Sequence, residues 1–213
     1  MNKFPIVIIG TAPRCGSTPY TDLIAQQLNM TAFHEPWCKK IVKFNEKYNE
    51  LQLIKNPFLH KDNYLKYIQY KKMTNKYVVK FFTLDMEHRC PYGEELKNGY
   101  KILLMRRDVI GQIASWYIAD TRKKFHVMND EIQKNYIISI NPTKISQYIE
   151  IVTRSCFFSN LYQEVDKKIY FEDVDFSKLQ VQYGKTKQPE NINEIRQEIE
   201  SQMKDTIPKH WRA

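Results

Sequence analysis

The residues best suited to chemistry lie together near the start of the chain, in residues 11–18, which read TAPRCGST. The β-branched run before them, residues 6–9, which ends in Gly10, predicts a strand buried on both faces of a parallel sheet. The residues after them predict an amphipathic helix, with Ser17 or Thr18 as its cap and Pro19 at its first position. Backbone N–H groups at a helix N-terminus, beside an arginine and two hydroxyl groups, suit a phosphate or sulfate. This stretch is therefore a candidate anion-binding loop.

Two classes of anion-binding enzyme are disfavoured by what the loop lacks. A P-loop kinase or GTPase needs G-x-x-x-x-G-K-[ST], but Gly16 is followed by Ser17, so the lysine that reaches the terminal phosphates is missing. A cysteine phosphatase would need an arginine six positions beyond Cys15, where this chain has Thr21. A plain turn between a strand and a helix remains the alternative interpretation of the loop.

A second strand-to-helix junction has the same character. Residues 100–105 predict a strand, and Asp108 is a natural N-cap for the helix that follows. Arg107 stands at the junction and Ser115 lies eight positions later, two turns into the helix. A guanidinium fork and a hydroxyl group in this arrangement can bind one phosphate. Arg106 is expected, by alternation, to point the other way and to be structural.

Three more side chains are candidates for the same edge of the sheet. Glu35, followed by Pro36, lies in the connection after the first helix, where it can accept a proton or form a plain surface turn. His34 is a rival base, because an imidazole ordinarily titrates near neutral pH. Lys80 lies inside a second buried strand, so it either points into an anion pocket or extends its stem to solvent.

Length and composition bound the whole molecule. The chain has 213 residues and 42% hydrophobic content, which is enough for one sizeable core, so we expect a single domain over residues 1–213. No apolar run approaches the roughly 20 residues that cross a bilayer, and no signal peptide precedes the first strand. We therefore expect a cytoplasmic protein without a membrane partner.

The net charge of +9 suits an anionic substrate, although a lysine-rich solvated surface explains the same charge. We expect no nucleic-acid partner. The four cysteines are scattered without metal-ligand spacing, which favours a reducing compartment and predicts no metal site. The chain is rich in Lys, Asn, Ile and Tyr, a composition typical of proteins encoded by AT-rich bacterial and viral genomes. The oligomeric state is not predicted by any of these features.

Taken together, the two junctions resemble the nucleotide-binding motifs of sulfotransferases that use 3′-phosphoadenosine 5′-phosphosulfate (PAPS). The run P-R-C-G-S-T resembles their 5′-phosphosulfate loop. The run L-L-M-R-R-D-V-I-G-Q-I-A-S-W-Y-I-A resembles their 3′-phosphate motif, in which an arginine and a serine eight residues later hold that phosphate. The residue pattern of this second run is most similar to that of the bacterial trehalose 2-sulfotransferase type and of carbohydrate sulfotransferases.

The resemblance implies a fold, a reaction and a set of site residues. The expected fold is a three-layer α/β/α domain with a mostly parallel central sheet, like that of P-loop NTPases. The expected reaction moves a sulfuryl group from PAPS to a hydroxyl group of a glycan or small-molecule alcohol, without a metal, and leaves adenosine 3′,5′-bisphosphate. The implied donor-binding residues are Arg14, Cys15, Gly16, Ser17, Thr18, Arg107 and Ser115, with Lys185 and Lys187 in a late basic loop. The implied catalytic residues are Glu35, Lys80 and Arg14.

The chain departs from the family at informative positions. Cytosolic phenol and steroid sulfotransferases have a histidine base two residues after the strand lysine, where this chain has Phe82. The base is therefore expected elsewhere, and Glu35 matches the glutamate of the carbohydrate-type relatives. Cys15 replaces a usual serine, which removes one hydroxyl contact but leaves the backbone unchanged. Glu172 and Asp173, in the late strand, are expected to be structural.

Residues 121–141 are polar, basic and aromatic, and we expect an acceptor-side loop or lid there. Two alternative functions remain open from the sequence. A nucleotide or small-molecule kinase of P-loop ancestry would explain the fold but not the missing lysine. A non-catalytic anion- or glycan-binding module would explain the basic charge but gives Glu35 no task.

Overall fold

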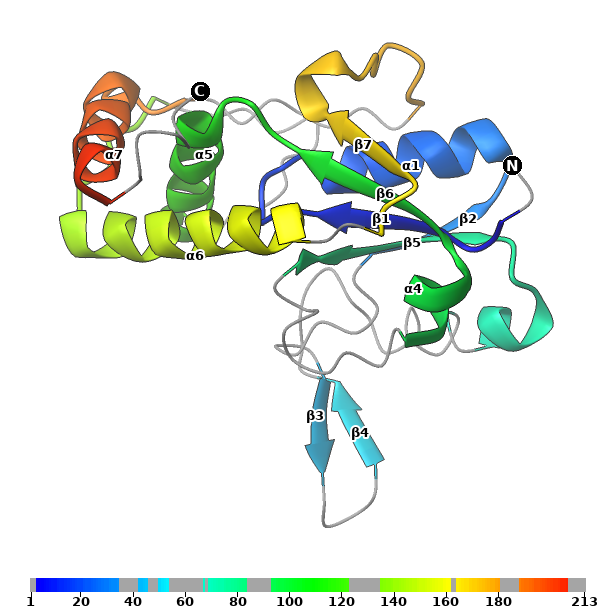
Figure 1. Cartoon of the computed structure of the whole chain (residues 1–213). Coiled ribbons are helices and arrows are strands. Elements are labelled where there is room, and N and C mark those ends of the chain that lie inside the picture. Colours follow the sequence, from blue (N-terminus) through cyan, green and yellow to red (C-terminus); the bar gives the residue numbers. More distant parts are fainter. Residues whose placement is uncertain are drawn as a thin grey trace.

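The centre of the protein is a five-stranded, all-parallel sheet with the strand order β2–β5–β1–β6–β7 (Figure 1). The computed structural model describes residues 3–34, 42–45, 50–53, 67, 69–83, 93–122, 135–161, 164–180 and 188–206. The strands of the sheet are β1 (Ile6–Gly10), β2 (Thr31–His34), β5 (Tyr77–Phe82), β6 (Tyr100–Met105) and β7 (Lys167–Tyr170). The predicted α/β class with a parallel sheet is confirmed.

The helices alternate with these strands along the chain. They are α1 (Ser17–Leu28), α4 (Gly93–Asn98), α5 (Val109–Arg122), α6 (Pro142–Leu161) and α7 (Ile192–Thr206), with a short 3-10 helix, η1, at Phe171–Asp173. A separate antiparallel pair is formed by β3 (Val42–Asn45) and β4 (Glu50–Leu53). Among the described helices, none combines the length and apolar character that a transmembrane span requires.

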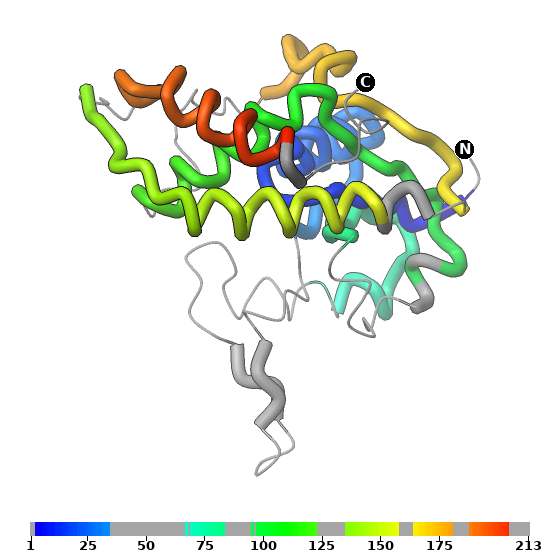
Figure 2. Tube along the Cα trace, turned by 60° about the vertical axis from the view of Figure 1, so that its left-hand side comes forward, coloured from blue at the N-terminus to red at the C-terminus, as the bar shows by residue number. Residues whose placement is uncertain are grey.

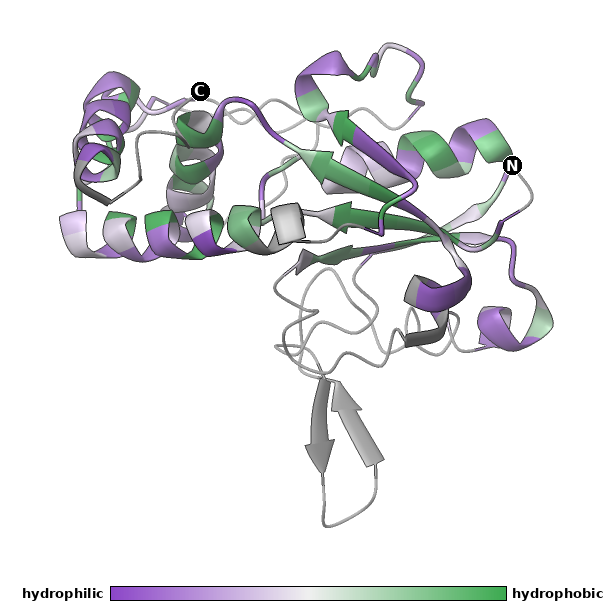
Figure 3. Cartoon of the chain, viewed as in Figure 1, coloured by the Kyte–Doolittle hydropathy of each residue, from purple (hydrophilic) through white to green (hydrophobic). Residues whose placement is uncertain are grey.

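Strand β1 is buried along its whole length, as its run of β-branched residues predicts. Its alternate residues face two different apolar clusters. Ile6 and Ile8 pack in a cluster that includes Tyr20 of α1. Val7 and Ile9 pack on the other side, in a cluster that includes Tyr67. Figure 3 shows the resulting concentration of hydrophobic residues along the central strands.

A third apolar cluster joins the three C-terminal helices, which pack against one another, with α6 lying across α5 and α7 (Figure 1 and Figure 2). It contains Ile113 of α5, Ile149 of α6 and Ile195 of α7. Ala12, from the loop after β1, belongs to the same cluster and is fully buried. The candidate anion loop is therefore packed onto the helical layer rather than projecting into solvent.

The order of the strands sets where a ligand would bind. From β1 the chain passes through α1 to β2 at one edge of the sheet, whereas from β6 it continues to β7 at the other edge. Because β1 and β6 are neighbours, their carboxyl ends form the topological switch point of the sheet, where ligands of open α/β sheets bind. The backbone N–H of Thr11 donates to the carbonyl of Leu104 at 3.2 Å, so the two predicted junctions lie side by side.

Candidate anion-binding site

The loop between β1 and α1 has an unusual backbone. Arg14 and Gly16 both adopt left-handed conformations, with φ of 68° and 84°. Such a conformation is uncommon for a residue with a side chain and often marks a functional turn. At Gly16 a side chain is also excluded by packing, because a Cβ atom would lie 2.0 Å from the ring of Phe171.

Helix α1 begins at Ser17, so the cap is Gly16 and the prediction of Ser17 or Thr18 as cap is wrong. The same shift puts Pro19 at the third helical position rather than the first, where its missing N–H still has no intrahelical partner to lose. Gly16 has no side chain to cap the helix, and no side-chain cap hydrogen bond is formed there. The first-turn N–H groups and the positive end of the helix dipole therefore suit an anion.

Arg14 carries its charge in a partly buried position. Its Nε donates to the hydroxyl of Ser115 on α5 at 3.0 Å. Burial and the neighbouring Arg106 guanidinium lower the pKa of Arg14, because both disfavour its charged form. Two guanidinium groups thus lie close together beside the loop, an arrangement that a bound anion would stabilise.

Lys80 brings a second kind of cation to the same helix terminus. Its side chain starts in β5, is only 3% exposed, and donates from Nζ to the hydroxyl of Thr18 at 2.8 Å. Of the two interpretations open from the sequence, the structure has the amine turned toward α1 rather than extended to solvent. Lys80 and Arg14 therefore approach the first turn of α1 from different elements.

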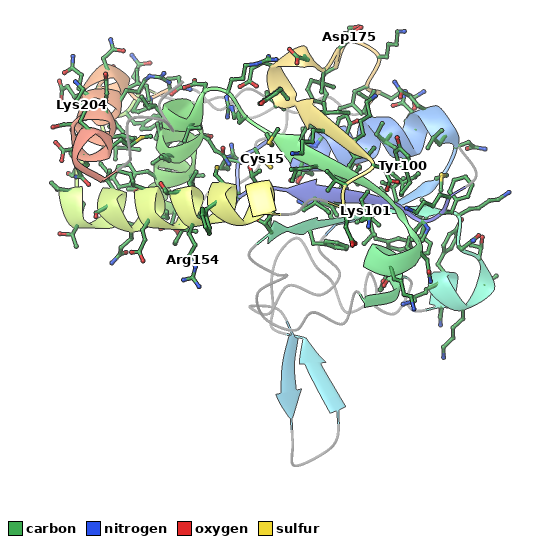
Figure 4. The ribbon with its side chains drawn as sticks, viewed as in Figure 1. Cys15, Tyr100, Lys101, Arg154, Asp175 and Lys204 are labelled. Carbon is green, nitrogen blue, oxygen red and sulfur yellow. The ribbon has the colours of Figure 1, made fainter. Side chains whose placement is uncertain are left out.

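The side chains of Cys15 and Ser17 are both buried. The Cys15 side chain is fully buried in the apolar cluster beneath α1, beyond the end of β1 (Figure 4). Ser17 is also buried, at 3% exposure.

The second junction differs from its expected geometry. Arg107 makes a two-pronged ion pair with Asp173, at 2.6 and 2.7 Å, and stacks over the ring of Tyr170 at 4.3 Å. Ser115 instead accepts its hydrogen bond from Arg14. Arg107 and Ser115, which the sequence pairs on one phosphate, are therefore held by different partners. The Asp173 ion pair raises the pKa of Arg107 and lowers that of Asp173.

Arg106 was expected to be structural and to point away from the site. In the structure its Nη1 donates to the carbonyl oxygen of Arg14 at 3.2 Å, so it contacts the anion loop directly. Gln112, which sequence reasoning missed, donates to the same loop. Two signals in the sequence could have drawn attention to it: its place in the run L-L-M-R-R-D-V-I-G-Q-I-A-S-W-Y-I-A, and its polar side chain on the otherwise apolar face of α5.

His34 is held in place at the end of β2. Its Nε2 lies 2.7 Å from a carboxylate oxygen of Asp22 on α1, and its register partner on β5 is Lys80. Its Nδ1 is buried and has no hydrogen-bond partner within the described part of the chain. His34 therefore fastens the edge strand to α1.

Several predicted site residues lie outside the described residues, namely Glu35, Lys185 and Lys187. The predicted lid at 121–141 is described only at its two ends. Residues 121–122 complete α5, and Ile138 exchanges two hydrogen bonds with Asn191, at 3.1 and 2.8 Å. Within the residues described, no group of three or more His, Cys, Asp and Glu side chains could hold a metal.

A hollow of about 620 Å³ lies elsewhere, beside the amino end of β1, and is lined mainly by apolar residues such as Phe4, Met30 and Met73. It lies at the opposite end of the strand from the anion loop, and the candidate chemistry does not depend on it.

No protein-family model matches the sequence, and a comparison with curated proteins finds no significant match.

Proposed function

We propose that this chain is a sulfotransferase that moves the sulfuryl group of PAPS to a hydroxyl group of a carbohydrate or another alcohol. The observation that carries the proposal is the convergence of Arg14, Lys80 and the α1 N-terminus at the switch point of the sheet. A buried and a partly buried cation beside a helix N-terminus suit a group that bears several negative charges. The motifs of both junctions support PAPS as the source of that group.

The finer fold assignment belongs to the same proposal. We assign the chain to the three-layer, P-loop-like architecture of sulfotransferases. The order β2–β5–β1–β6–β7 supports it, as do the apolar clusters on both faces of β1. In this scheme the lysine that P-loop kinases carry within the loop is replaced by Lys80 from a neighbouring strand.

The chain's own residues would have three tasks around the donor, which supplies the sulfuryl group and a phosphate leaving group when bound. Arg14, Lys80 and the N–H groups of Gly16, Ser17 and Thr18 would hold the 5′-phosphosulfate. The cations among them would neutralise charge on the leaving oxygen, which is the main electrostatic contribution available here. Positioning and neutralisation of this kind resemble phosphoryl transfer.

The third task, proton removal from the acceptor, is assigned to Glu35. Its competitor His34 has one nitrogen held by Asp22 and the other buried. We therefore give His34 the role of fixing the end of β2, directly before Glu35. A carboxylate base of this kind typically contributes about 10²–10⁴-fold to the rate.

Binding of the 3′-phosphate requires two exchanges of partner. Arg107 would give up the carboxylate of Asp173, and Ser115 would give up Arg14, so that both could bind the phosphate. A carboxylate and a phosphate fit the guanidinium fork in the same two-pronged way. Both side chains of the Arg107–Asp173 ion pair are more than half exposed. Because exposed ion pairs contribute little to stability, breaking this pair requires little free energy.

The proposal is tested by calorimetric titration of adenosine 3′,5′-bisphosphate, 5′-AMP and ATP into the wild type, Arg107→Ala and Arg154→Ala. The control, Arg154, is exposed on α6 and points away from the sheet in Figure 4. We expect a clear preference for the bisphosphate, weakened about 10- to 100-fold by Arg107→Ala, because a hydrogen bond to a charged group is lost. Arg154→Ala should bind like the wild type. Equal affinity for all three ligands, or tighter Mg²⁺-dependent binding of ATP, would contradict the proposal and favour the kinase alternative.

A further inference from the structure

The anion loop is shaped by side chains of the neighbouring β6–α5 unit. Three successive carbonyl groups of the loop accept hydrogen bonds from it. The Nε2 of Gln112 donates to Ala12 at 3.2 Å and to Pro13 at 3.1 Å, and Nη1 of Arg106 donates to Arg14 at 3.2 Å. The backbone of the loop is therefore held on one side throughout its tightest part.

The direction of these bonds matters for an anion. A carbonyl oxygen carries partial negative charge and repels a phosphate or sulfate, whereas an N–H group attracts one. The C=O and N–H of one peptide unit point in opposite directions. Drawing the Pro13 carbonyl toward α5 therefore turns the Arg14 N–H the other way.

The backbone conformation of the loop requires hydrogen bonds from outside the loop. Arg14 has a left-handed backbone conformation, which a residue with a side chain adopts only when its surroundings enforce it. The only turn hydrogen bond described within the loop, from the N–H of Cys15 to the carbonyl of Ala12, is long at 3.3 Å. The three hydrogen bonds donated by Gln112 and Arg106 therefore outnumber the one described within the loop.

The burial of the Gln112 side chain is energetically unfavourable. Its side chain is 1% exposed, and its Oε1 is buried without a hydrogen-bond partner among the described residues. Because both facing groups are carbonyl oxygens, only the amide nitrogen can be turned toward them. A buried amide with an unsatisfied oxygen is unfavourable, so its two donated bonds are the feature that explains its presence.

We propose that Gln112 is a positioning residue, which holds the Ala12 and Pro13 carbonyls away from the anion so that the loop binds the 5′-phosphosulfate. This inference rests on the proposed function. Arg106 contributes in the same way, but its charge also attracts the anion directly. Gln112 is neutral, so replacing it with another neutral residue, methionine, changes the geometry of the loop without changing the charge of the site.

The test compares Gln112→Met and Gln112→Glu with the wild type. Methionine has a similar length and no donors. Glutamate is nearly isosteric, but its carboxylate accepts hydrogen bonds and repels both carbonyls. The matched control is Gln26→Met, because the Gln26 side chain also donates to a backbone carbonyl, that of Lys178 at 2.8 Å, near the far end of α1.

Two nucleotides distinguish a change in the loop from a general change in the fold. Adenosine 3′,5′-bisphosphate carries a phosphate at the loop, whereas 3′-AMP lacks it. We expect Gln112→Met to weaken the bisphosphate about 10-fold, within the range that misplaced binding groups cause, and Gln112→Glu to weaken it further. Affinity for 3′-AMP should stay within about twofold in both, as should both affinities in Gln26→Met.

Equal losses for the two ligands would show that Gln112 only maintains the fold, and would overturn the inference. Unchanged bisphosphate affinity in a folded Gln112→Met protein would overturn it as well. If the wild type did not distinguish the bisphosphate from 3′-AMP, the proposed donor would be wrong. Titration with inorganic pyrophosphate would then decide the inference separately, since weaker binding by Gln112→Met supports a positioning role and unchanged binding refutes it.

Discussion

At the scale of single residues, Lys80 is the side chain whose placement in the structure says most about the chemistry. A lysine with 3% exposure is rare unless its charge has a task, and its amine lies at the first turn of α1. In the proposed P-loop-like scheme, it takes the place of the lysine missing from the loop. Its contribution should appear in the rate of transfer as well as in binding.

We predict that Lys80→Met lowers the rate of sulfuryl transfer about 10²-fold, because one preorganised charge beside the leaving oxygen is lost. Steady-state kinetics with PAPS measures the effect. Lys101→Met is the matched control, because Lys101 is also a buried strand lysine, 7% exposed, but lies near the amino end of β6 (Figure 4). Equal losses in the two variants would assign Lys80 a purely structural role.

Removing the charge of Asp173 is predicted to strengthen ligand binding, whereas removing that of Lys80 is predicted to impair function. Its carboxylate occupies the guanidinium fork of Arg107 at 2.6 and 2.7 Å. Asp173→Asn removes the competing charge, so we expect adenosine 3′,5′-bisphosphate to bind a few-fold more tightly in calorimetry. Asp175→Asn makes the same charge change two residues away, where Asp175 accepts from the N–H of Ser177, and should change the affinity less. Weaker binding by Asp173→Asn would mean that Asp173 orients Arg107 for the ligand.

At the scale of elements, a buried carboxylate joins α4 to the sheet. Glu95 is 1% exposed, and it bonds Tyr67, Tyr77 of β5 and Lys71, the last two at 3.2 and 2.8 Å. Burial raises the pKa of Glu95, but hydrogen bonds from Lys71 and Tyr67 outweigh that effect and leave the pKa below its ordinary value. The charged form is therefore the one that stabilises the folded state.

A depressed folded-state pKa contributes stability that is present above the unfolded pKa, near 4.3, and is lost as the pH falls through the folded value. We predict that Glu95→Gln lowers the free energy of unfolding at neutral pH by about 2 kcal/mol. The variant should also lose less stability than the wild type below about pH 4. Urea unfolding at several pH values measures both. The control is Glu164→Gln, because Glu164 is 88% exposed, and parallel pH curves for Glu95→Gln and the wild type would contradict the prediction.

The elements that the sequence predicts well are those with long, regular patterns. Strands β1, β5 and β6 and helices α1 and α5 lie where their apolar periodicity indicates. The apolar face over residues 145–161, after Asn141 and Pro142, likewise predicts α6.

One prediction needed adjustment, because the late strand, expected over residues 167–174, ends at Tyr170 and continues as η1. The charged, mostly surface helix that residues 190–204 predict is present as α7, in which Ile195 and Ile199 are the buried residues among those described. Strand β2 and the β3–β4 pair were missed, because four-residue strands are too short for a period to be recognised.

At the scale of the whole molecule, the sequence predicts the two strand-to-helix junctions but not how they interlock. The contact of Arg14 with Ser115 joins residues 101 positions apart, and that of Gln112 with Ala12 joins residues 100 apart. Such contacts follow from the neighbouring positions of β1 and β6, which local patterns do not encode. The same packing explains why Arg106, rather than Arg107, contacts the loop.

The central claim is sulfuryl transfer to a hydroxyl group, and the most direct test is to incubate the protein with sulfur-radiolabelled PAPS and a panel of sugars and simple alcohols. We expect label on an acceptor, with an equal amount of adenosine 3′,5′-bisphosphate, and loss of both in Glu35→Gln but not in Arg154→Ala. The contradicting result would be no labelled acceptor from PAPS, together with Mg²⁺-dependent transfer of phosphate from ATP to a member of the same panel.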